Sequence, residues 1–251
     1  MIESFISFLN HLPSIVVFLF EFFTLFALLI VMAYLFREIG LYVFITVVMI
    51  AANIQVLKSV EYTFYSEPIA LGKMAICFTF LVSNVLAECF GRKSAYKGIL
   101  LCFFANFSLI VLMLITIGYP PITFGNSVNF HEHLRVIFTP APGVFFASVI
   151  SFMISHFMDI SAFLQLKNYF KDKYLWFRAF CSNALASLVD NITFYTLALY
   201  IFNDFFIDFQ TLIYSYILGT LIFRIFITIF SSIIIYAAKY ILLSPKIHRG
   251  H

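Results

Sequence analysis

Charged side chains are scarce in this sequence. Asp, Glu, Lys and Arg together make up 11% of the 251 residues, whereas they make up about 25% of an ordinary soluble domain. Hydrophobic residues make up 63%, and the apolar runs exceed the roughly 20 residues that a helix needs to cross a bilayer. No soluble fold could bury that much apolar surface, so the composition indicates an integral membrane protein.

Sequence motifs for cofactors and catalysis are also absent. The chain has no Gly-rich phosphate loop, no His-Glu-x-x-His signature, no Gly-x-Ser-x-Gly elbow and no Cys-x-x-Cys pair. Its four cysteines lack metal-ligand spacing, so we expect them to be buried free thiols. We therefore expect no enzymatic activity, no cofactor and no metal site. The basic residues lie in loops, and we expect no nucleic-acid partner.

The apolar runs predict an all-α fold, a polytopic helical bundle that forms a single membrane domain over residues 1–251. Glu3 stands where a signal peptide would be basic, so we expect no cleaved signal peptide. We expect about seven spans in the cytoplasmic (inner) membrane, at residues 14–36, 40–57, 68–90, 98–118, 143–165, 175–202 and 210–238.

Basic residues alternate between the predicted connections. Ten of them follow the first, third, fifth and seventh spans, whereas the opposite connections carry Lys58 and Arg135. Lys and Arg are enriched in cytoplasmic loops, so this alternation predicts an N-terminus outside and a C-terminus in the cytoplasm. The ten are Arg37, Arg92, Lys93, Lys97, Lys167, Lys171, Lys173, Lys239, Lys246 and Arg249.

The segment Ser83–Gly98 carries the clearest polar signal inside an apolar run. Asn84 and Glu88 stand four residues apart, so on a helix they share a face. A carboxylate at that depth must be paired or must line a water-filled path. A second segment, Tyr119–Pro142, is bracketed by prolines, and we expect a short interfacial helix around His131–Phe138 that could cap a site or merely connect two spans.

Polar residues from four spans reach a similar depth. A rise of 1.5 Å per residue places them between about 18 and 24 Å below the outer surface. Lone charges there are costly, so we expect Asp190 to pair with Arg224 and Asp159 to pair with Arg178. Structural ion pairs remain the alternative to a binding site. The residues at this depth are Asn84, His156, Asp159, Asp190 and Arg224.

Five groups of short motifs follow one another within about residues 41–240. They are Ala52-Asn53 with Lys58, Ser83-Asn84 with Glu88 and Gly91-Arg92-Lys93, Ala147-Ser148 with His156 and Asp159-Ile160, Leu175-Trp176-Phe177-Arg178 with Ser182 and Asp190, and Gly219-Thr220 with Arg224. In their order and spacing they resemble the queuosine precursor transporter family, also described as a vitamin uptake family. The resemblance implies a membrane carrier for 7-deazaguanine bases with six core helices. These would be similar to the substrate-binding subunits of energy-coupling-factor transporters, with residues 14–36 as an N-terminal addition.

A guanine-like base would need a polar edge and an aromatic neighbour. Buried carboxylates such as Glu88 and Asp190 can accept the donors of the base, and amides such as Asn53 and Asn84 can orient it. Arg178 and Arg224 would pair with the carboxylates, and His156 could carry a proton. The substrate-binding candidates are therefore Asn53, Asn84, Glu88, His156, Asp159 and Asp190.

Together these observations predict an importer of a queuosine precursor such as queuine, preQ1 or preQ0, which would serve salvage for tRNA modification. A carrier of another small planar nutrient, such as a vitamin, and a non-transporting membrane scaffold are the alternatives. Besides the purine-like substrate and the lipid bilayer, the sequence leaves open a homodimer and an energy-coupling partner.

Overall fold

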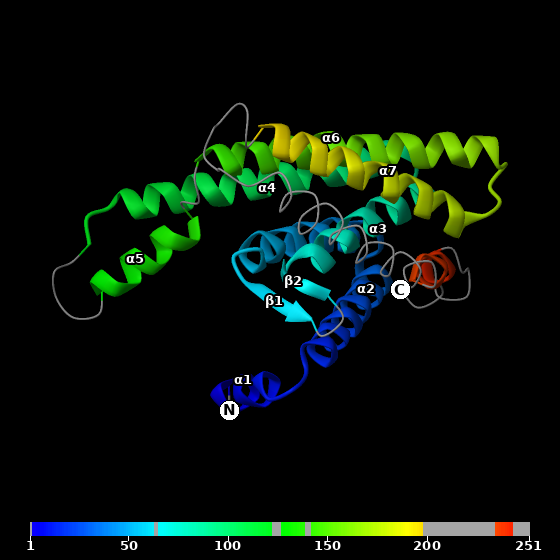
Figure 1. Cartoon of the computed structure of the whole chain (residues 1–251). Coiled ribbons are helices and arrows are strands. Elements are labelled where there is room, and N and C mark those ends of the chain that lie inside the picture. The colour runs from blue at the N-terminus through cyan, green and yellow to red at the C-terminus, as the bar shows by residue number, and fades with distance from the viewer. Residues whose placement is uncertain (1, 63–64, 122–126, 139–141, 198–233, 243–251) are drawn as a thin grey trace.

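The structure is a computed structural model that describes residues 2–62, 65–121, 127–138, 142–197 and 234–242, and it is mostly helical (Figure 1). Arg224 and most of the predicted span 210–238 lie outside the described residues. The elements in chain order are α1 (Ile2–Asn10), α2 (Ser14–Gln55), β1 (Ser59–Tyr62), β2 (Tyr65–Ala70), α3 (Lys73–Cys89), α4 (Arg92–Gly118), α5 (Ser127–Phe138), α6 (Pro142–Tyr169) and α7 (Leu175–Thr196), and residues 234–242 are also helical.

Helix α2 reverses direction at Arg37, whose backbone is not helical (φ 52°, ψ −124°). Gln55 Nε2 donates a hydrogen bond of 2.7 Å to Glu21 Oε1, although 34 residues of straight helix would span about 50 Å. The two halves of α2 therefore pack side by side and match the predicted spans 14–36 and 40–57. A Cβ at Gly40 would lie 2.1 Å from the carbonyl oxygen of Met32, so this close approach requires glycine.

A β-hairpin follows α2, and the sequence analysis missed it. Strands β1 and β2 pair antiparallel, with Ser59 opposite Ala70 and Val60 opposite Ile69. The prediction that a helix begins at residue 68 is therefore wrong. Pro68 disfavours a helical conformation at the preceding residue, and α3 begins only after Gly72, which has a φ of 74°.

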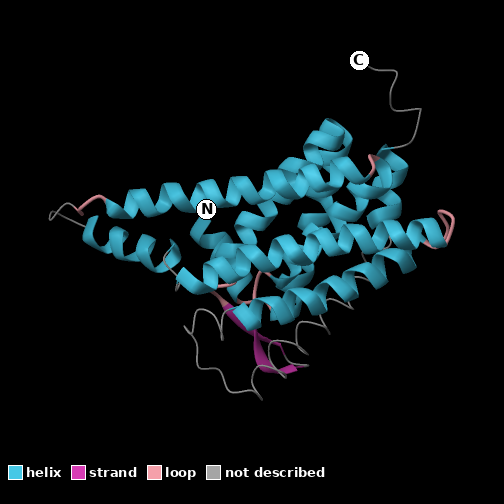
Figure 2. Ribbon diagram, turned by 90° about the horizontal axis from the view of Figure 1, so that it is seen from above, coloured by secondary structure: helices cyan, strands magenta, loops and turns pink. Residues whose placement is uncertain are grey.

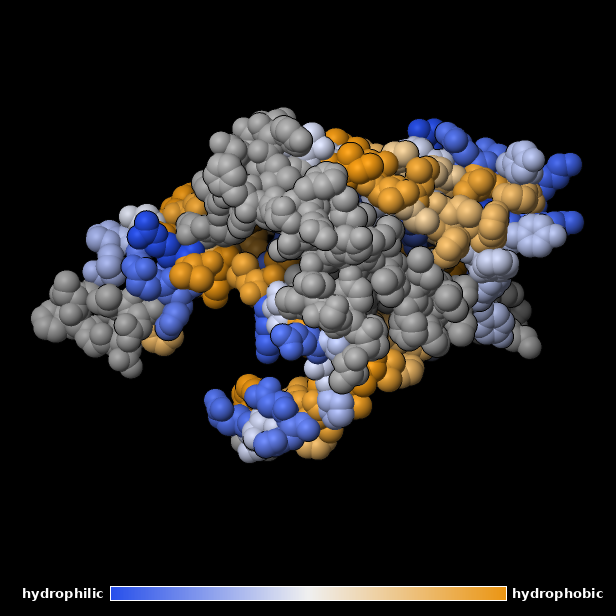
Figure 3. Space-filling model, viewed as in Figure 1, coloured by the Kyte–Doolittle hydropathy of each residue, from blue (hydrophilic) through white to orange (hydrophobic). Residues whose placement is uncertain are grey.

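Long apolar helices dominate the rest of the described chain. Three of them are long and apolar enough to cross a membrane, namely Ser14–Gln55, Arg92–Gly118 and Ala147–Tyr169. Figure 3 shows apolar side chains along the flanks of α6 and α7 and hydrophilic ones at the turn between them. The count of seven spans and the orientation of the termini stay predictions, whereas the predicted short helix in the segment Tyr119–Pro142 is confirmed as α5.

Helix α3 packs against α2, α4, α6 and α7. Figure 2 shows the β-hairpin at one edge of the helices. Thr79 contacts His156 and Ser83 contacts Asp159, so α3 and α6 run parallel. Residue numbers rise together along both helices, as the predicted alternation of spans requires.

An ion cluster around Glu88 joins one end of these helices to residues 234–242. The guanidinium of Arg178, which is fully buried, bridges both Glu88 carboxylate oxygens at 3.3 and 3.4 Å. Lys167 Nζ lies 3.1 Å from the same carboxylate, and Lys239 also forms an ion pair with it. We call these four residues the Glu88 cluster.

The Glu88 cluster contains Arg178, which we expected to pair with a different carboxylate. We expected Arg178 to pair with Asp159, but the structure gives Arg178 the carboxylate of Glu88, and Asp159 accepts a hydrogen bond from Ser83 instead. Helices α3 and α7 run antiparallel, so one helical turn beyond Asn84 on α3 lies level with Arg178 on α7. The expected partner of Asp190, Arg224, lies outside the described residues.

Replacing Glu88 by Gln should destabilise the protein strongly. It leaves the buried Arg178 guanidinium without an opposite charge, and breaking a buried ion pair in this way costs about 3–5 kcal/mol. We expect the melting temperature of the purified protein in detergent to fall by several degrees. Asp172→Asn is the matched control, because the Asp172 side chain is 70% exposed and pairs with Lys167, whereas the Asp172 contact with Arg178 is made by the backbone carbonyl and survives the substitution. Equal melting temperatures for Glu88→Gln and the wild type would show that the cluster does not stabilise the fold.

Replacing Gly98 by Leu should also destabilise the protein. A Cβ at Gly98 would already lie 2.9 Å from Leu86 Cδ1 and 3.0 Å from the Tyr42 ring, and overpacking of this kind costs about 1–3 kcal/mol. Gly118→Leu, in the last turn of the same helix, is the control, because nothing lies within 4 Å of a Cβ there. Thermal unfolding should separate the two variants, and similar losses in both would refute close packing at Gly98.

Candidate functional site

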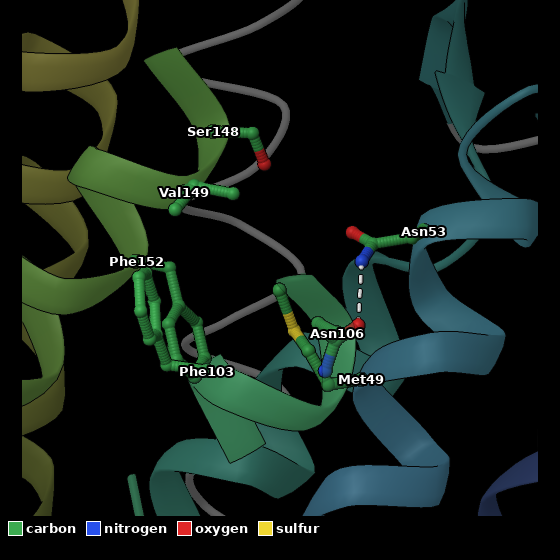
Figure 4. A pocket seen from close by; sticks show the side chains of 7 residues that line it. All are labelled: Met49, Asn53, Phe103, Asn106, Ser148, Val149 and Phe152. Carbon is green, nitrogen blue, oxygen red and sulfur yellow. Dashed lines mark hydrogen bonds between the residues drawn. The ribbon is translucent and has the colours of Figure 1, made fainter. Parts of the chain in front are cut away.

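A small cavity lies between the second half of α2, α4 and α6 (Figure 4). Its volume is about 30 Å³. An apolar wall and a polar wall face each other across it. The lining residues are Met49, Asn53, Phe103, Asn106, Ser148, Val149 and Phe152.

The polar wall of the cavity consists of the amides of Asn53 and Asn106. Asn53 Nδ2 donates to Asn106 Oδ1 at 3.0 Å, and Asn106 Nδ2 donates to the backbone carbonyl of Cys102 at 2.9 Å. These two bonds fix the orientation of both amides. Ser148 lies across the cavity from Asn53, and the rings of Phe103 and Phe152 lie together on the opposite wall (Figure 4). The cavity thus offers hydrogen-bond donors and acceptors beside aromatic rings.

A layer of buried polar side chains, which we call the polar seam, runs between α3, α6 and α7. His156 lies in it, with Nε2 3.0 Å from Thr79 Oγ1 and Nδ1 3.1 Å from the carbonyl oxygen of Phe152. The imidazole stacks on Phe80, with ring centroids 3.9 Å apart and 16° between the planes. The Phe152 ring lies 4.2 Å away on another side.

Two carboxylates of the polar seam are held by serine hydroxyls. Ser83 Oγ lies 3.0 Å from Asp159 Oδ2. Ser151 and Ser155 lie 2.6 and 3.3 Å from Asp190 Oδ1. Hydrogen bonds to an ionised carboxylate are stronger than those between neutral groups, so this arrangement can stabilise negative charge inside an apolar bundle.

Asn84 completes the polar seam on the side of α7. Its Nδ2 donates to Asn183 Oδ1 at 2.9 Å and contacts Ser182 Oγ at 3.5 Å. Asn84 is fully buried, and its Oδ1 has no hydrogen-bond partner within the part of the chain that the structure describes. A buried acceptor without a partner carries a free-energy cost, and a donor on a ligand would remove that cost.

The structure distributes the predicted site residues over three places. Asn53 lines the cavity, and Asn84, His156, Asp159 and Asp190 lie in the polar seam. Glu88 and Arg178 belong instead to the Glu88 cluster, and Arg224 lies outside the described residues. Phe152 joins the first two places, because it lines the cavity and its ring contacts His156.

The sequence analysis missed several lining residues. Asn106 is a polar residue in the middle of the apolar run 98–118, and that signal alone could have identified it. Phe103 and Phe152 could not be chosen among 35 phenylalanines. Thr79 contacts His156, and Ser151 and Ser155 contact Asp190. Only the packing of the helices reveals these contacts.

Comparison with known proteins identifies the family. The family model described as "Putative vitamin uptake transporter" matches residues 70–238. A curated protein of Bacillus subtilis (strain 168), named "Probable queuosine precursor transporter", is 29% identical over 164 residues, which cover 65% of this chain and 69% of that protein. No solved structure matches.

The matched residues include α3, α4, α6 and α7 and therefore most of the residues described above. They also contain four of the five groups of motifs on which the resemblance was predicted. The predicted resemblance is thus confirmed, and the chain belongs to the family of putative vitamin uptake transporters.

Proposed function

We propose that this protein imports a queuosine precursor, a 7-deazaguanine base such as queuine, preQ1 or preQ0, across the cytoplasmic membrane. The family is one of transporters, and the Bacillus subtilis relative is named for a queuosine precursor. The observation that carries the proposal is the cavity, because its amide pair and its aromatic wall suit a planar base with a polar edge.

The chemistry of the cavity supports a purine-like substrate. Such a base presents an amide-like edge of N–H donors and a carbonyl, and the amides of Asn53 and Asn106 can answer both kinds of group. Its flat ring can pack against Phe103 and Phe152, just as enzymes that bind a single base commonly stack it against aromatic side chains. In this proposal Asn84, His156, Asp159 and Asp190 complete the polar surroundings when the substrate moves from the cavity into the seam.

Glu88 takes a different role from the one that the sequence analysis assigned. Its carboxylate is 2% exposed and already has three cationic partners, which leave few lone pairs for a base. We therefore propose that Glu88 holds the ends of the helices together.

The cavity must widen to hold a base. A buried water needs about 10–15 Å³ of such space, so the about 30 Å³ seen here would hold about two waters. Binding therefore requires α2, α4 and α6 to move apart. Movement of packed helices around a central site is what a carrier performs when it exposes that site to each side in turn.

A vitamin carrier is the second candidate, because the description of the family names vitamin uptake. It would use the same cavity for another planar ring. A scaffold without a substrate would have no use for two amides and a hydroxyl around a cavity, and this observation disfavours the scaffold.

Thermal unfolding with candidate ligands tests the substrate. A ligand present at 100 times its dissociation constant stabilises the folded state by about 2.7 kcal/mol, so the melting temperature should rise by several degrees with queuine, preQ1 or preQ0. Guanine, whose ring carries nitrogen in place of the 7-position carbon, should shift it less. A shift with riboflavin alone would favour the vitamin carrier, and no shift with any of these compounds would contradict the proposal.

The amide pair should determine the affinity for the base. Asn53→Leu and Asn106→Leu each remove a side chain that bonds the polar edge, and we expect each to weaken binding about tenfold, since one such bond contributes about 1.4 kcal/mol. Asn168→Leu is the control, because Asn168 lies exposed near the end of α6. Calorimetric titration of the purified variants measures the effect. Unchanged affinity in both cavity variants would place the substrate elsewhere.

A further inference from the structure

His156 has hydrogen-bonding neighbours that can serve both of its protonation states. It is fully buried and contacts the rings of Phe80 and Phe152. Among the neighbours of its two ring nitrogens are Thr79 Oγ1 and the carbonyl oxygen of Phe152. The chemistry of these two neighbours indicates where a proton can be held.

The Phe152 carbonyl determines the state of Nδ1. A carbonyl oxygen only accepts hydrogen bonds, so Nδ1, 3.1 Å away, must carry a hydrogen. This holds for both the neutral ring and the imidazolium. The ring nitrogen that gains or loses a proton is therefore Nε2, which faces Thr79.

The Thr79 hydroxyl can serve both states of Nε2. Its single hydrogen has two acceptors within reach, the carbonyl oxygen of Ile76 at 2.7 Å and Nε2 at 3.0 Å. When the ring is neutral, the hydroxyl donates to Nε2. When Nε2 carries a proton, the hydroxyl turns toward Ile76 and accepts from Nε2–H. Rotation of a single O–H bond thus lets Thr79 bond to Nε2 in either state.

A second hydroxyl repeats the arrangement one turn along α3. Ser83 Oγ lies 2.7 Å from the carbonyl oxygen of Phe80 and 3.0 Å from Asp159 Oδ2. The Ser83 hydroxyl donates its hydrogen to the ionised carboxylate of Asp159. If Asp159 takes up the proton, the hydroxyl can turn toward the carbonyl oxygen of Phe80. The proton therefore has a second holder nearby whose surroundings also adapt without movement of the backbone.

Two acidic groups of the described residues lie in the same seam as His156. Its own helix carries Asp159, and α7 carries Asp190 and, further along, Arg178, which pairs with Glu88 at the end of α3. From α4, Tyr96 contacts Ser161 of α6 at 2.7 Å. Asp159 and Asp190 can contribute negative charge opposite an imidazolium.

We propose that His156 is the proton-binding site through which this carrier couples import to an inward flow of protons. A proton from outside binds Nε2, the Thr79 hydroxyl turns to Ile76, and the proton leaves to the inside after the helices have moved. In this proposal a proton gradient supplies the energy. This role rests on the proposed function for its substrate, but the binding of the proton by His156 does not.

Accumulation of radiolabelled queuine in proteoliposomes tests the coupling. With the outside more acidic by about one pH unit and one proton moved per substrate, the wild type should accumulate queuine about tenfold, since one unit corresponds to 1.36 kcal/mol. His156→Gln keeps hydrogen-bonding groups but binds no proton. With this variant the internal and external concentrations of queuine should become equal. His133→Gln, at an exposed position on α5, should behave as the wild type. Tenfold accumulation by His156→Gln would overturn the proposal.

The Thr79 hydroxyl provides a second pair of variants in case His156→Gln does not fold or transport. Thr79→Val keeps the shape of the side chain and removes the hydroxyl, so a protonated Nε2 loses its acceptor. The pH at which half-maximal accumulation occurs should fall by about one unit or more. Thr79→Ser restores the hydroxyl and should restore the wild-type value. The same midpoint in all three proteins would overturn the proposed switch.

Proton binding can also be measured without any substrate. The ¹⁵N spectrum of histidine-labelled wild-type protein should contain a ring whose Nδ1 stays protonated while Nε2 changes from acceptor to donor between about pH 8 and pH 5. That signal should be missing from His156→Gln. If queuine neither binds nor moves but this signal appears, the proposed function fails and the proton site stands. If queuine is imported and the His156 ring stays neutral throughout, the proton site fails and the function stands.

Discussion

The arrangement of this bundle depends on satisfying polar side chains that lie inside apolar helices. Hydrocarbon offers no hydrogen-bond partner, so every buried hydroxyl, amide and carboxylate must find one within the protein. Thr79, Ser83 and Asn84 of α3 meet this requirement with partners on α6 and α7. Apolar packing alone would allow these helices to slide by a turn. The paired polar groups select one register, and that register places the cavity and the Glu88 cluster.

Charge is distributed along the bundle according to its cost. At the ends of the helices, Lys167 and Lys239 are 24% and 33% exposed, so their ammonium groups can reach water while they hold Glu88. Deeper in the bundle, Ser83 contacts Asp159, Ser151 and Ser155 contact Asp190, and Thr79 contacts His156, in each case through a hydroxyl. A hydroxyl can donate or accept a hydrogen bond, so these contacts suit either protonation state of the partner.

Hydropathy and the distribution of basic residues predicted much of the architecture. The two halves of α2, the helices α4 and α6 and the short helix α5 lie close to their predicted positions. Distance along each span also placed His156, Asp159 and Asp190 at a common depth, and the structure brings these residues into one seam. Depth follows from counting residues, because the helical rise is constant.

Which residues face each other could not be obtained in the same way. Pairing depends on how each helix is rotated about its axis and on its neighbours, and neither follows from residue numbers. Arg178 was therefore assigned to Asp159 when the antiparallel packing of α3 and α7 gives it Glu88. The same limit hid Phe103 and Phe152, since a cavity is formed by residues from separate helices. The hairpin was missed because β1 and the first half of β2 fall in the predicted connection between the spans 40–57 and 68–90, and the apolar residues at the end of β2 were taken as the start of the next span.

Phe152 connects the two functional parts of the molecule. Its ring lines the cavity and lies 4.2 Å from the His156 ring, and its carbonyl oxygen holds His156 Nδ1. If a base enters the cavity as proposed, it pushes against this ring, because the volume of about 30 Å³ is too small to hold it otherwise. Any displacement of Phe152 changes the packing of the imidazole, because the Phe152 ring contacts the imidazole and the Phe152 carbonyl oxygen bonds to its Nδ1. Occupation of the cavity and protonation of His156 therefore act on one shared residue, and this contact allows each to influence the other.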